Sequence, residues 1–389
     1  MMLAFAAAAL VVWLVLVFAR GGFWRARQRD ALWPRDPDPL AWPEVVAIIP
    51  ARNEAADVGR CVGSLLRQAY AGRFSIVLVD DESDDGTAGV ARAAALAAGA
   101  PERLAVLEGA PRPPGWSGKV WAMNQGLEAV GRRESPPSRL LFCDADIEFA
   151  PDALETLVRR AEAGGFALVS LMARLRCESL AERALIPAFV FFFQMLYPFA
   201  WVGDVRARTA AAAGGCMLAD REALRRAGGF AAMRAALIDD CALAALMKPQ
   251  GPLALALTRR VVSLRAYPSF GDIAAMVQRS AYAQLGYSPW RLVGAAAGMA
   301  LTFLVAPAAA LFASGGAALL GLVAWIVMAL AFQPMLRFYG RATLWGLALP
   351  LIAAAYLVFT LNSAYLYWRG RGGLWKGRVQ AISTTRGQR

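Results

Sequence analysis

The sequence predicts an α/β domain with a mostly parallel sheet, set between one N-terminal and about three C-terminal transmembrane helices. Apolar residue types make up 58% of the 389 residues, which exceeds the roughly 45–50% of ordinary soluble domains. Long charge-free runs stand near both ends of the chain. Between them, short apolar runs alternate with amphipathic helical patterns, which is typical of an α/β sheet.

The first transmembrane segment is predicted within residues 1–23. Residues 3–19 form a run of 17 residues without a charge, close to the minimum length that crosses the hydrocarbon. No Lys or Arg precedes this run, whereas four arginines follow it between residues 20 and 29. The positive-inside rule therefore places the N-terminus outside and the next domain in the cytoplasm. The alternative, a cleaved signal peptide, lacks its usual basic start.

The α/β domain is predicted at residues 41–270. Its near-continuous apolar strands indicate a sheet that is covered on both faces. Ligands of such sheets bind beyond the carboxyl ends of the strands, so polar residues that directly follow a strand are candidate site residues. We expect strands at 45–49, 75–79, 104–107, 139–143 and 166–170, and helices at 56–68, 86–98, 118–130 and 152–161.

Three polar clusters follow predicted strands. The first spans residues 50–54. The second, residues 80–87, ends in residues that suit a helix N-terminus, but capping does not explain the adjacent Asp80 and Asp81. Two neighbouring carboxylates repel each other unless a polar or cationic ligand binds there, which predicts a ligand contact. The third is Asp144-Ala145-Asp146, which is either a solvated turn or a pair of carboxylates for one hard cation.

The composition limits the chemistry. The chain has 41 basic and 29 acidic residues, and its net charge of +12 suits anionic lipid or a phosphate-rich substrate better than nucleic acid. It contains no histidine, which excludes imidazole acid–base catalysis, Ser-His-Asp and Cys-His nucleophiles, and His-bound zinc. Proton transfer must therefore use carboxylates. The five cysteines form no C-x-x-C pair, which predicts reduced thiols.

The C-terminal part predicts an interfacial amphipathic helix at residues 271–291 and transmembrane helices at 292–367. Residues 292–332 carry no charge over 41 residues and are interrupted by Ser314-Gly315-Gly316, which indicates a hairpin of two helices. A third run, residues 342–367, is also long enough to cross, with a kink expected at Pro350. Four crossings place the tail, residues 368–389, outside, whereas its basic residues favour the inside.

Five motifs stand in a fixed order along the α/β domain. They are Pro50-Ala51-Arg52-Asn53-Glu54, Asp80-Asp81-Glu82-Ser83-Asp84-Asp85-Gly86-Thr87, Gly118-Lys119 with Ala122-Met123-Asn124-Gln125-Gly126, Asp144-Ala145-Asp146, and Ile238-Asp239-Asp240. Their order and spacing resemble family 2 glycosyltransferases of GT-A fold, over roughly residues 44–260. Residues 191–199, 214–218 and 237–244 are similar to the hopene-associated glycosyltransferase subgroup of bacterial hopanoid biosynthesis.

The resemblance implies an enzyme that takes a sugar from a nucleotide-sugar donor, such as a UDP-sugar, with Mg²⁺ or Mn²⁺ at the diphosphate. It places the metal at Asp146 and Asp144. It places the catalytic base at Asp240, with Asp239 as the substitute, although Asp240 could also simply start a helix. The donor-binding residues it implies are Pro50, Ala51, Arg52, Glu54, Asp80, Asp81, Ser83, Lys119, Asp144, Ala145 and Asp146, and the acceptor-binding residues are Gly214, Gly215 and Cys216.

The acceptor is predicted to be a membrane lipid, and the closer similarity points to a hopanoid. The aromatic segment at residues 186–202 contains two prolines and a glutamine, so it either lies at the membrane interface, where a lipid could enter, or packs inside the protein. Where processive synthases carry Gln-x-x-Arg-Trp, this chain has Gln278-Arg279-Ser280-Ala281-Tyr282. This departure favours the transfer of a single sugar over polymer synthesis.

The leading hypothesis is thus a multi-pass enzyme of the bacterial cytoplasmic membrane, with its catalytic domain in the cytoplasm and no nucleic-acid partner. One alternative is a polyprenyl-phosphate glycosyltransferase, whose phosphate acceptor would need little help from Asp240. Another is a catalytically silent, lipid-binding membrane scaffold. The retained acids at the strand ends argue against the scaffold, because a silent protein need not keep unpaired carboxylates.

Overall fold

The computed structural model describes residues 1–375 and 378–379, which form two compact units. Unit 1 comprises residues 1–27, residues 177–198 and the chain from residue 266 onward. Unit 2 comprises residues 28–176 and 199–265. Most of the predicted basic tail, residues 368–389, lies outside the described residues.

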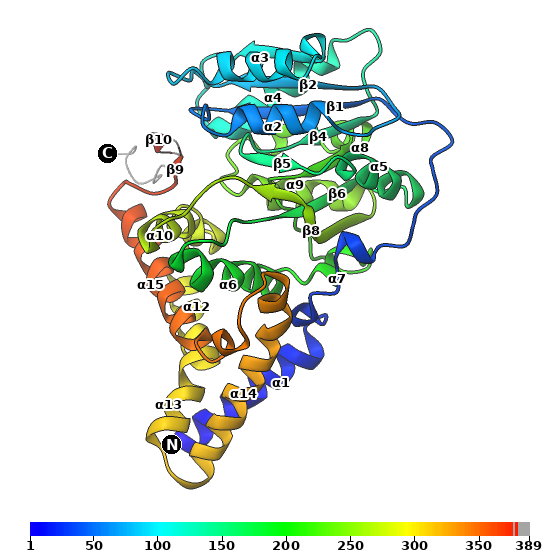
Figure 1. The fold of residues 1–389 in the computed structure, drawn as a ribbon. Coiled ribbons are helices and arrows are strands. Elements are labelled where there is room, and N and C mark those ends of the chain that lie inside the picture. The colour runs from blue at the N-terminus through cyan, green and yellow to red at the C-terminus, as the bar shows by residue number, and fades with distance from the viewer. Residues whose placement is uncertain (376–377, 380–389) are drawn as a thin grey trace. The chain divides into compact units, whose positions relative to one another are not determined.

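Unit 2 is built around one eight-stranded sheet (Figure 1). Parallel pairs join β3 to β2, β2 to β1, β1 to β4 and β6 to β8, whereas the pairs β4–β7, β6–β7 and β5–β8 are antiparallel. The α/β class is confirmed, with a mixed sheet in place of the mostly parallel one that we predicted. The strand order is β3 (Leu104–Glu108), β2 (Phe74–Asp80), β1 (Val45–Ala51), β4 (Arg139–Phe142), β7 (Met217–Asp220), β6 (Leu168–Arg174), β8 (Leu253–Ser263) and β5 (Ile147–Phe149).

Helices cover both faces of this sheet. On one face, α2 (Val58–Leu66), α3 (Thr87–Ala97) and α5 (Ala153–Ala163) enclose a buried core that includes Val45, Ala47 and Ile49. Alternate residues of a strand point to opposite faces, so Ile48 faces the other side, against α4 (Gly118–Gly131). Figure 1 shows α2 and α4 on these opposite faces. The four predicted helices are present, with ends within two residues of those expected.

The sequence did not predict β5, β7 and β8. Strands β5 and β7 are three and four residues long, too short to show a period. Strand β8 has 11 residues, but Thr258, Arg259 and Arg260 interrupt its apolar pattern. Five residues, 248–252, separate it from the helix α9 (Asp239–Met247). The remaining helices of unit 2 are the short α7 (Phe199–Gly203) and α8 (Arg221–Arg226).

A linker that precedes β1 is fixed to β8. The backbone oxygen of Gln28 accepts a hydrogen bond from the Leu257 N–H at 2.8 Å. Asp30 is only 5% exposed, and its Oδ2 accepts hydrogen bonds from Thr258 Oγ1 at 2.7 Å and from Arg260 Nη1 at 2.8 Å. A buried carboxylate needs such partners, so these contacts hold the linker against the domain.

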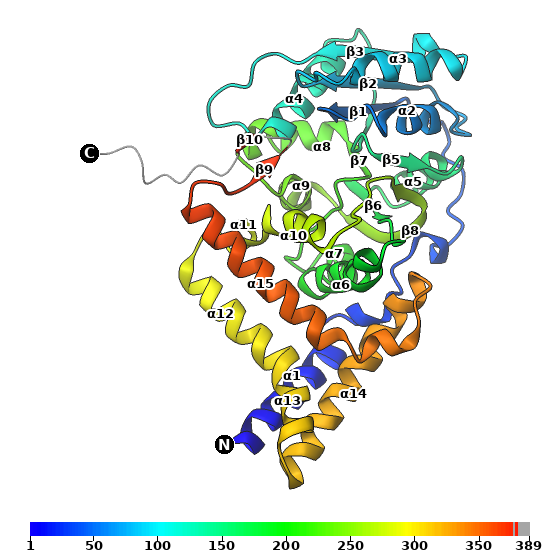
Figure 2. The ribbon, with the colours of Figure 1, turned by 60° about the vertical axis from the view of Figure 1, so that its left-hand side comes forward.

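Among its described residues, unit 1 contains four helices that are long and apolar enough to cross a membrane, one N-terminal and three C-terminal. Their bounds are α1 (Met2–Ala19), a continuous span at Pro289–Phe312 that includes α12 (Pro289–Met299) and α13 (Val305–Phe312), α14 (Gly315–Phe338) and α15 (Leu349–Trp368). Figure 2 shows α1, α13 and α14 side by side. The turn predicted at Ser314-Gly315-Gly316 lies where α13 gives way to α14: Ser314 precedes α14, and Gly315, its first residue, has a positive φ of 59°.

Two expectations for unit 1 were wrong in detail. Pro350 lies in the first turn of α15, where it costs no helical hydrogen bond, so it starts the helix and does not kink it. Residues 271–291 do not form one helix. They contain most of α10 (Phe270–Gln278), all of α11 (Ala281–Gln284) and the start of α12, with positive φ at Gly286 and Tyr287 between the last two.

The aromatic segment forms α6 (Leu180–Leu196), followed by α7. The Phe191 ring contacts the rings of Phe23 and Phe332, with centroids 5.3 and 5.1 Å apart. The Phe192 ring contacts Phe303 at 5.4 Å. Phe191 is fully buried. The sequence left two interpretations of this segment open, a position at the membrane interface or packing inside the protein. The contacts of Phe191 and Phe192 agree with packing inside the protein.

Candidate active site

The two predicted donor-binding loops, after β1 and β2, are joined to each other. The Asn53 N–H donates a hydrogen bond to Ser83 Oγ at 3.0 Å. The Arg52 guanidinium donates to the backbone oxygen of Asp81, whose side chain is buried. Both loops lie at the same sheet edge because β1 and β2 are parallel and end together. The structure thus brings together the two clusters that the sequence singled out.

Some of the predicted donor-binding residues stand at the ends of the strands and hold these loops in place. Pro50 and Ala51 are the last residues of β1, and both are buried. The Ala51 backbone oxygen accepts the Asp81 N–H at 2.8 Å, and Asp80 Oδ1 accepts the Ser83 N–H at 3.1 Å. These contacts shape the loops, so Pro50 and Ala51 position the neighbouring residues.

Lys119 joins two acidic elements of the candidate site. It lies in the first turn of α4, and its Nζ is 2.7 Å from Asp144 Oδ1, just after β4, and 2.9 Å from Asp239 Oδ2, at the start of α9. Burial alone would lower the pKa of Lys119, but the two carboxylates outweigh it and raise this pKa. Lys119 therefore remains a cation between them.

Asp240 has different surroundings from its neighbour. Its Oδ2 accepts the Gly214 N–H at 3.1 Å, and its Oδ1 accepts the Cys241 N–H at 2.7 Å. Desolvation and the adjacent Asp239 raise the pKa of Asp240 to about 6, although Lys119 opposes the shift. A carboxylate with a pKa close to neutrality is suited to general base catalysis.

Gly214 borders three charged groups. A Cβ placed at this position would lie 3.1 Å from Lys119 Nζ, 3.6 Å from Asp240 Oδ2 and 3.7 Å from Asp144 Oδ2. A side chain larger than that of glycine would therefore crowd Lys119 at this position.

The other two predicted acceptor residues lie elsewhere. A Cβ at Gly215 would be 3.0 Å from Ile147 Cδ1, so this glycine permits close packing of the sheet. Cys216 is fully buried in the apolar core of unit 2. Of the predicted acceptor-binding residues, Gly214 alone borders the charged cluster.

Arg265 was not among the site residues predicted from the sequence. Its Nε donates to Asp146 Oδ2 at 2.7 Å, and its Nη2 donates to Glu54 Oε1 at 2.8 Å. Strand β8 delivers it there, because β8 pairs antiparallel with β5 and the Leu264 N–H donates to the Asp146 backbone oxygen at 2.8 Å. The signal was available in principle: Arg265 is a polar residue just after an apolar strand, but that strand was not predicted.

The residues of the Asp-x-Asp motif fit a divalent cation. Asp144 and Asp146 offer carboxylate oxygens, the donors that Mg²⁺ and Mn²⁺ prefer, and the Asp144 side chain is 35% exposed. Ala145 is buried in the core between them. In the part of the chain that the structure describes, no three His, Cys, Asp or Glu side chains gather as a metal site. Two carboxylates suffice for an ion whose other ligands are water and a diphosphate.

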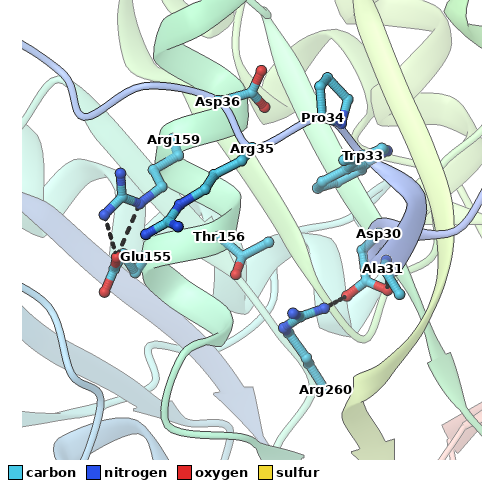
Figure 3. Close-up of a pocket in the computed structure, with 10 residues that line it drawn as sticks. All are labelled: Asp30, Ala31, Trp33, Pro34, Arg35, Asp36, Glu155, Thr156, Arg159 and Arg260. Carbon is cyan, nitrogen blue, oxygen red and sulfur yellow. Dashed lines mark hydrogen bonds and ion pairs between the residues drawn. The ribbon is translucent and has the colours of Figure 1, made fainter.

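A cavity of about 280 Å³ lies against the linker, α5 and β8 (Figure 3). Two of its arginines pair with carboxylates that also line it, Arg159 with Glu155 and Arg260 with Asp30. None of the predicted site residues lines it, so it is not the candidate active site. Its lining residues are Asp30, Ala31, Trp33, Pro34, Arg35, Asp36, Glu155, Thr156, Arg159 and Arg260.

Comparisons with known proteins identify the domain. Residues 46–228 match the sequence model of glycosyl transferase family 2. No curated protein matches the sequence. The structure is similar to that of the mannosyltransferase PcManGT from Pyrobaculum calidifontis in complex with GDP-Man and Mn²⁺, with a TM-score of 0.56 and 22% identity over 94% of this chain and 99% of that chain.

Two further structures show lower similarity. Mannosyl-3-phosphoglycerate synthase from Rubrobacter xylanophilus has a TM-score of 0.41 and 21% identity over 66% of this chain and 80% of that chain. Glucosyl-3-phosphoglycerate synthase from Mycobacterium tuberculosis, in complex with Mg²⁺ and UDP, has a TM-score of 0.39 and 22% identity over 63% of this chain and 79% of that chain. The family match and the fold together show that the chain carries a family 2 glycosyltransferase domain of GT-A fold, which makes it a sugar-transferring enzyme.

Proposed function

We propose that this protein transfers one sugar, with inversion, from a nucleotide-sugar donor to a hydroxyl group of a membrane lipid. The observation that supports this most is the convergence of Lys119, Asp144 and Asp240 around Gly214. This arrangement places a cation, a candidate metal ligand and a candidate base beside the same glycine. The similarity to the hopene-associated subgroup favours a hopanoid acceptor and a UDP-sugar donor.

In this proposal, the loops after β1 and β2 bind the nucleoside. Lys119 faces the diphosphate from the start of α4, where the helix dipole adds to its positive charge. Asp146 and Asp144 hold Mg²⁺ or Mn²⁺, which when bound would stabilise the negative charge on the leaving diphosphate. Fixed positive groups of this kind usually make the largest contribution to catalysis.

Asp240 takes the proton of the acceptor hydroxyl. Its pKa of about 6 leaves it mostly ionised at neutral pH, and the N–H groups of Gly214 and Cys241 fix its orientation. Asp239 is less suited to this role because its Oδ2 lies 2.9 Å from Lys119 Nζ. One base and one direct displacement invert the configuration of the sugar.

The membrane part of the proposal rests on unit 1. Its four long apolar helices suit an enzyme of the bacterial cytoplasmic membrane, whose acceptor reaches it from the lipid phase. The departure from Gln-x-x-Arg-Trp at residues 278–282 supports the transfer of one sugar per acceptor.

Transfer can be tested with the full-length protein in membranes. Labelled UDP-sugars and GDP-sugars are added to membranes with and without hopanoids, and the lipid extracts are compared. We expect a labelled lipid that depends on Mg²⁺ or Mn²⁺ and is lost in excess EDTA. Label in hopanoid-free membranes would redirect the proposal to another lipid, and a complete lack of labelled lipid would refute the lipid acceptor.

Two variants test the metal site within the same assay. Asp146→Asn should abolish transfer and leave the fold intact. Glu222→Gln, which neutralises an exposed carboxylate on α8, should keep full activity. Full activity of the unaltered protein in excess EDTA would contradict the metal role of Asp146.

A further inference from the structure

We infer that Arg265 is a built-in counter-cation of Asp146, which competes with the divalent ion for this carboxylate and is released from it when the ion binds. The inference rests on the proposed metal role of Asp146. It adds a residue outside the motifs that the sequence singled out.

The contact is specific in its geometry. One guanidinium donates from Nε to Asp146 Oδ2 at 2.7 Å and from Nη2 to Glu54 Oε1 at 2.8 Å. The planar guanidinium fixes its donors in one fork, so it holds both carboxylates at the same time. Asp146 follows β4 and Glu54 follows β1, and Arg265 thereby joins the metal motif to a donor-binding loop.

Burial explains why a counter-cation is needed. Asp146 is only 7% exposed, and the Glu54 side chain is 13% exposed. A buried carboxylate without a partner is strongly unfavourable, so Arg265 supplies the partner that Asp146 needs before the metal arrives. Lys119 serves Asp144 in the same way, at 2.7 Å.

Competition follows from charge. A guanidinium and a divalent cation on one carboxylate would lie a few ångströms apart and repel each other strongly in a partly buried site. The ion must therefore displace Arg265 from Asp146. Glu54 remains as its partner, so the displaced side chain stays beside the donor-binding loop.

The test is a binding measurement that needs no sugar transfer. Mn²⁺ alone is titrated into the purified full-length protein in detergent, and the free ion is followed by electron paramagnetic resonance. Arg265→Gln removes the charge and keeps a hydrogen-bond donor for Asp146. We expect it to bind Mn²⁺ about five- to tenfold more tightly than the unaltered protein, since the apparent affinity rises when the competing state is removed.

Two variants serve as controls. Arg225→Gln removes the same charge from an exposed ion pair on α8 and should leave the Mn²⁺ affinity unchanged. Arg265→Lys keeps the charge without the fork and should fall between the unaltered protein and Arg265→Gln. It also carries the test if Arg265→Gln does not fold, as judged by thermal unfolding.

The outcomes separate this inference from the proposed function. Asp146→Asn should lose the Mn²⁺ site; if it binds Mn²⁺ normally, the proposed metal role fails and the inference fails with it. If Asp146→Asn loses Mn²⁺ but Arg265→Gln binds it equally or more weakly, only the competition is overturned. Equal tightening in Arg225→Gln would also overturn it, because net charge alone would then explain the effect.

Discussion

Asp239 and Asp240 are adjacent in the chain but differ in what holds them. Asp239 forms an ion pair with Lys119, while Asp240 accepts hydrogen bonds from two backbone N–H groups. The ion pair holds Asp239 Oδ2 against Lys119, 2.9 Å from its Nζ. Within the described residues, Asp240 has no such ion pair at its oxygens, and burial and the neighbouring Asp239 raise its pKa to about 6. Their surroundings therefore assign them different tasks.

Asp240→Asn tests this difference. Asparagine keeps the size and one of the two accepting oxygens but cannot take a proton, so turnover should fall on the order of 10²-fold or more while donor binding persists. Turnover is measured with labelled donor, and donor binding by calorimetry.

Asp239→Asn is the matched comparison. Near-normal turnover in Asp240→Asn with a collapse in Asp239→Asn would move the base to Asp239. Near-normal turnover in both would favour a phosphate acceptor that needs no base, and hence a polyprenyl-phosphate glycosyltransferase.

The pH dependence of transfer should report the same group. The base works only when ionised, and the pKa of Asp240 is raised to about 6. We therefore expect kcat/KM to be level above this pH and to fall about tenfold for each pH unit below it. The profile is measured at constant metal and ionic strength. If the residual activity of Asp240→Asn shows the same fall in kcat/KM at low pH, a group other than Asp240 causes that fall.

At the scale of elements, the strands β1, β2, β3, β4 and β6 were predictable and the strands β5, β7 and β8 were not. Strands β1, β2 and β4 are continuous apolar runs, and the polar residues that follow them supplied most of the candidate site. Strands β5, β7 and β8 depend on pairing with partners distant in sequence. Because β8 was missing from the prediction, Arg265 had no predicted place, whereas Asp146 did.

Close packing of α4 on β1 provides a test at this scale. A Cβ at Gly126 would lie 2.5 Å from Ile48 Cγ2, which is too close, so Gly126→Ala must shift the helix or the strand. We expect a loss of about 1–3 kcal/mol in the free energy of unfolding. Urea unfolding of the full chain in detergent measures it.

Gly131→Ala is the control for this substitution. Gly131 lies in the same helix, and a Cβ there would meet nothing within 4 Å. The gain in helix propensity should make this variant equal to or slightly more stable than the unaltered protein. Equal destabilisation by both substitutions would contradict the packing argument.

For the whole molecule, the sequence predicted a membrane-spanning part and an α/β domain outside the membrane. The structure forms two compact units. Unit 1 gathers the four long apolar helices of the described residues together with the segment 177–198, which contains α6 and was not predictable as part of that unit. Its aromatic rings pack onto residues more than 100 positions away, as Phe192 does onto Phe303. Such long-range contacts leave no local signature in the sequence.

The orientation in the membrane remains a prediction of the positive-inside rule. Four arginines follow α1 and none precedes it, so residues 21–291 should lie in the cytoplasm. Protease added to sealed inverted vesicles should digest this region, and protease added to right-side-out vesicles should not. If the region were protected from protease in the inverted vesicles, the predicted orientation would be wrong.

The tie between the linker and β8 also has a consequence for biosynthesis. Asp30 leaves the ribosome 230 residues before Arg260, one of its two side-chain partners. At about 5–20 residues per second, β8 follows roughly 10–50 s later. By then β1, β2 and β4 have long been available to pair with one another. The linker therefore docks late, when the nascent domain is nearly complete and the carboxylate of Asp30 finally meets its cation.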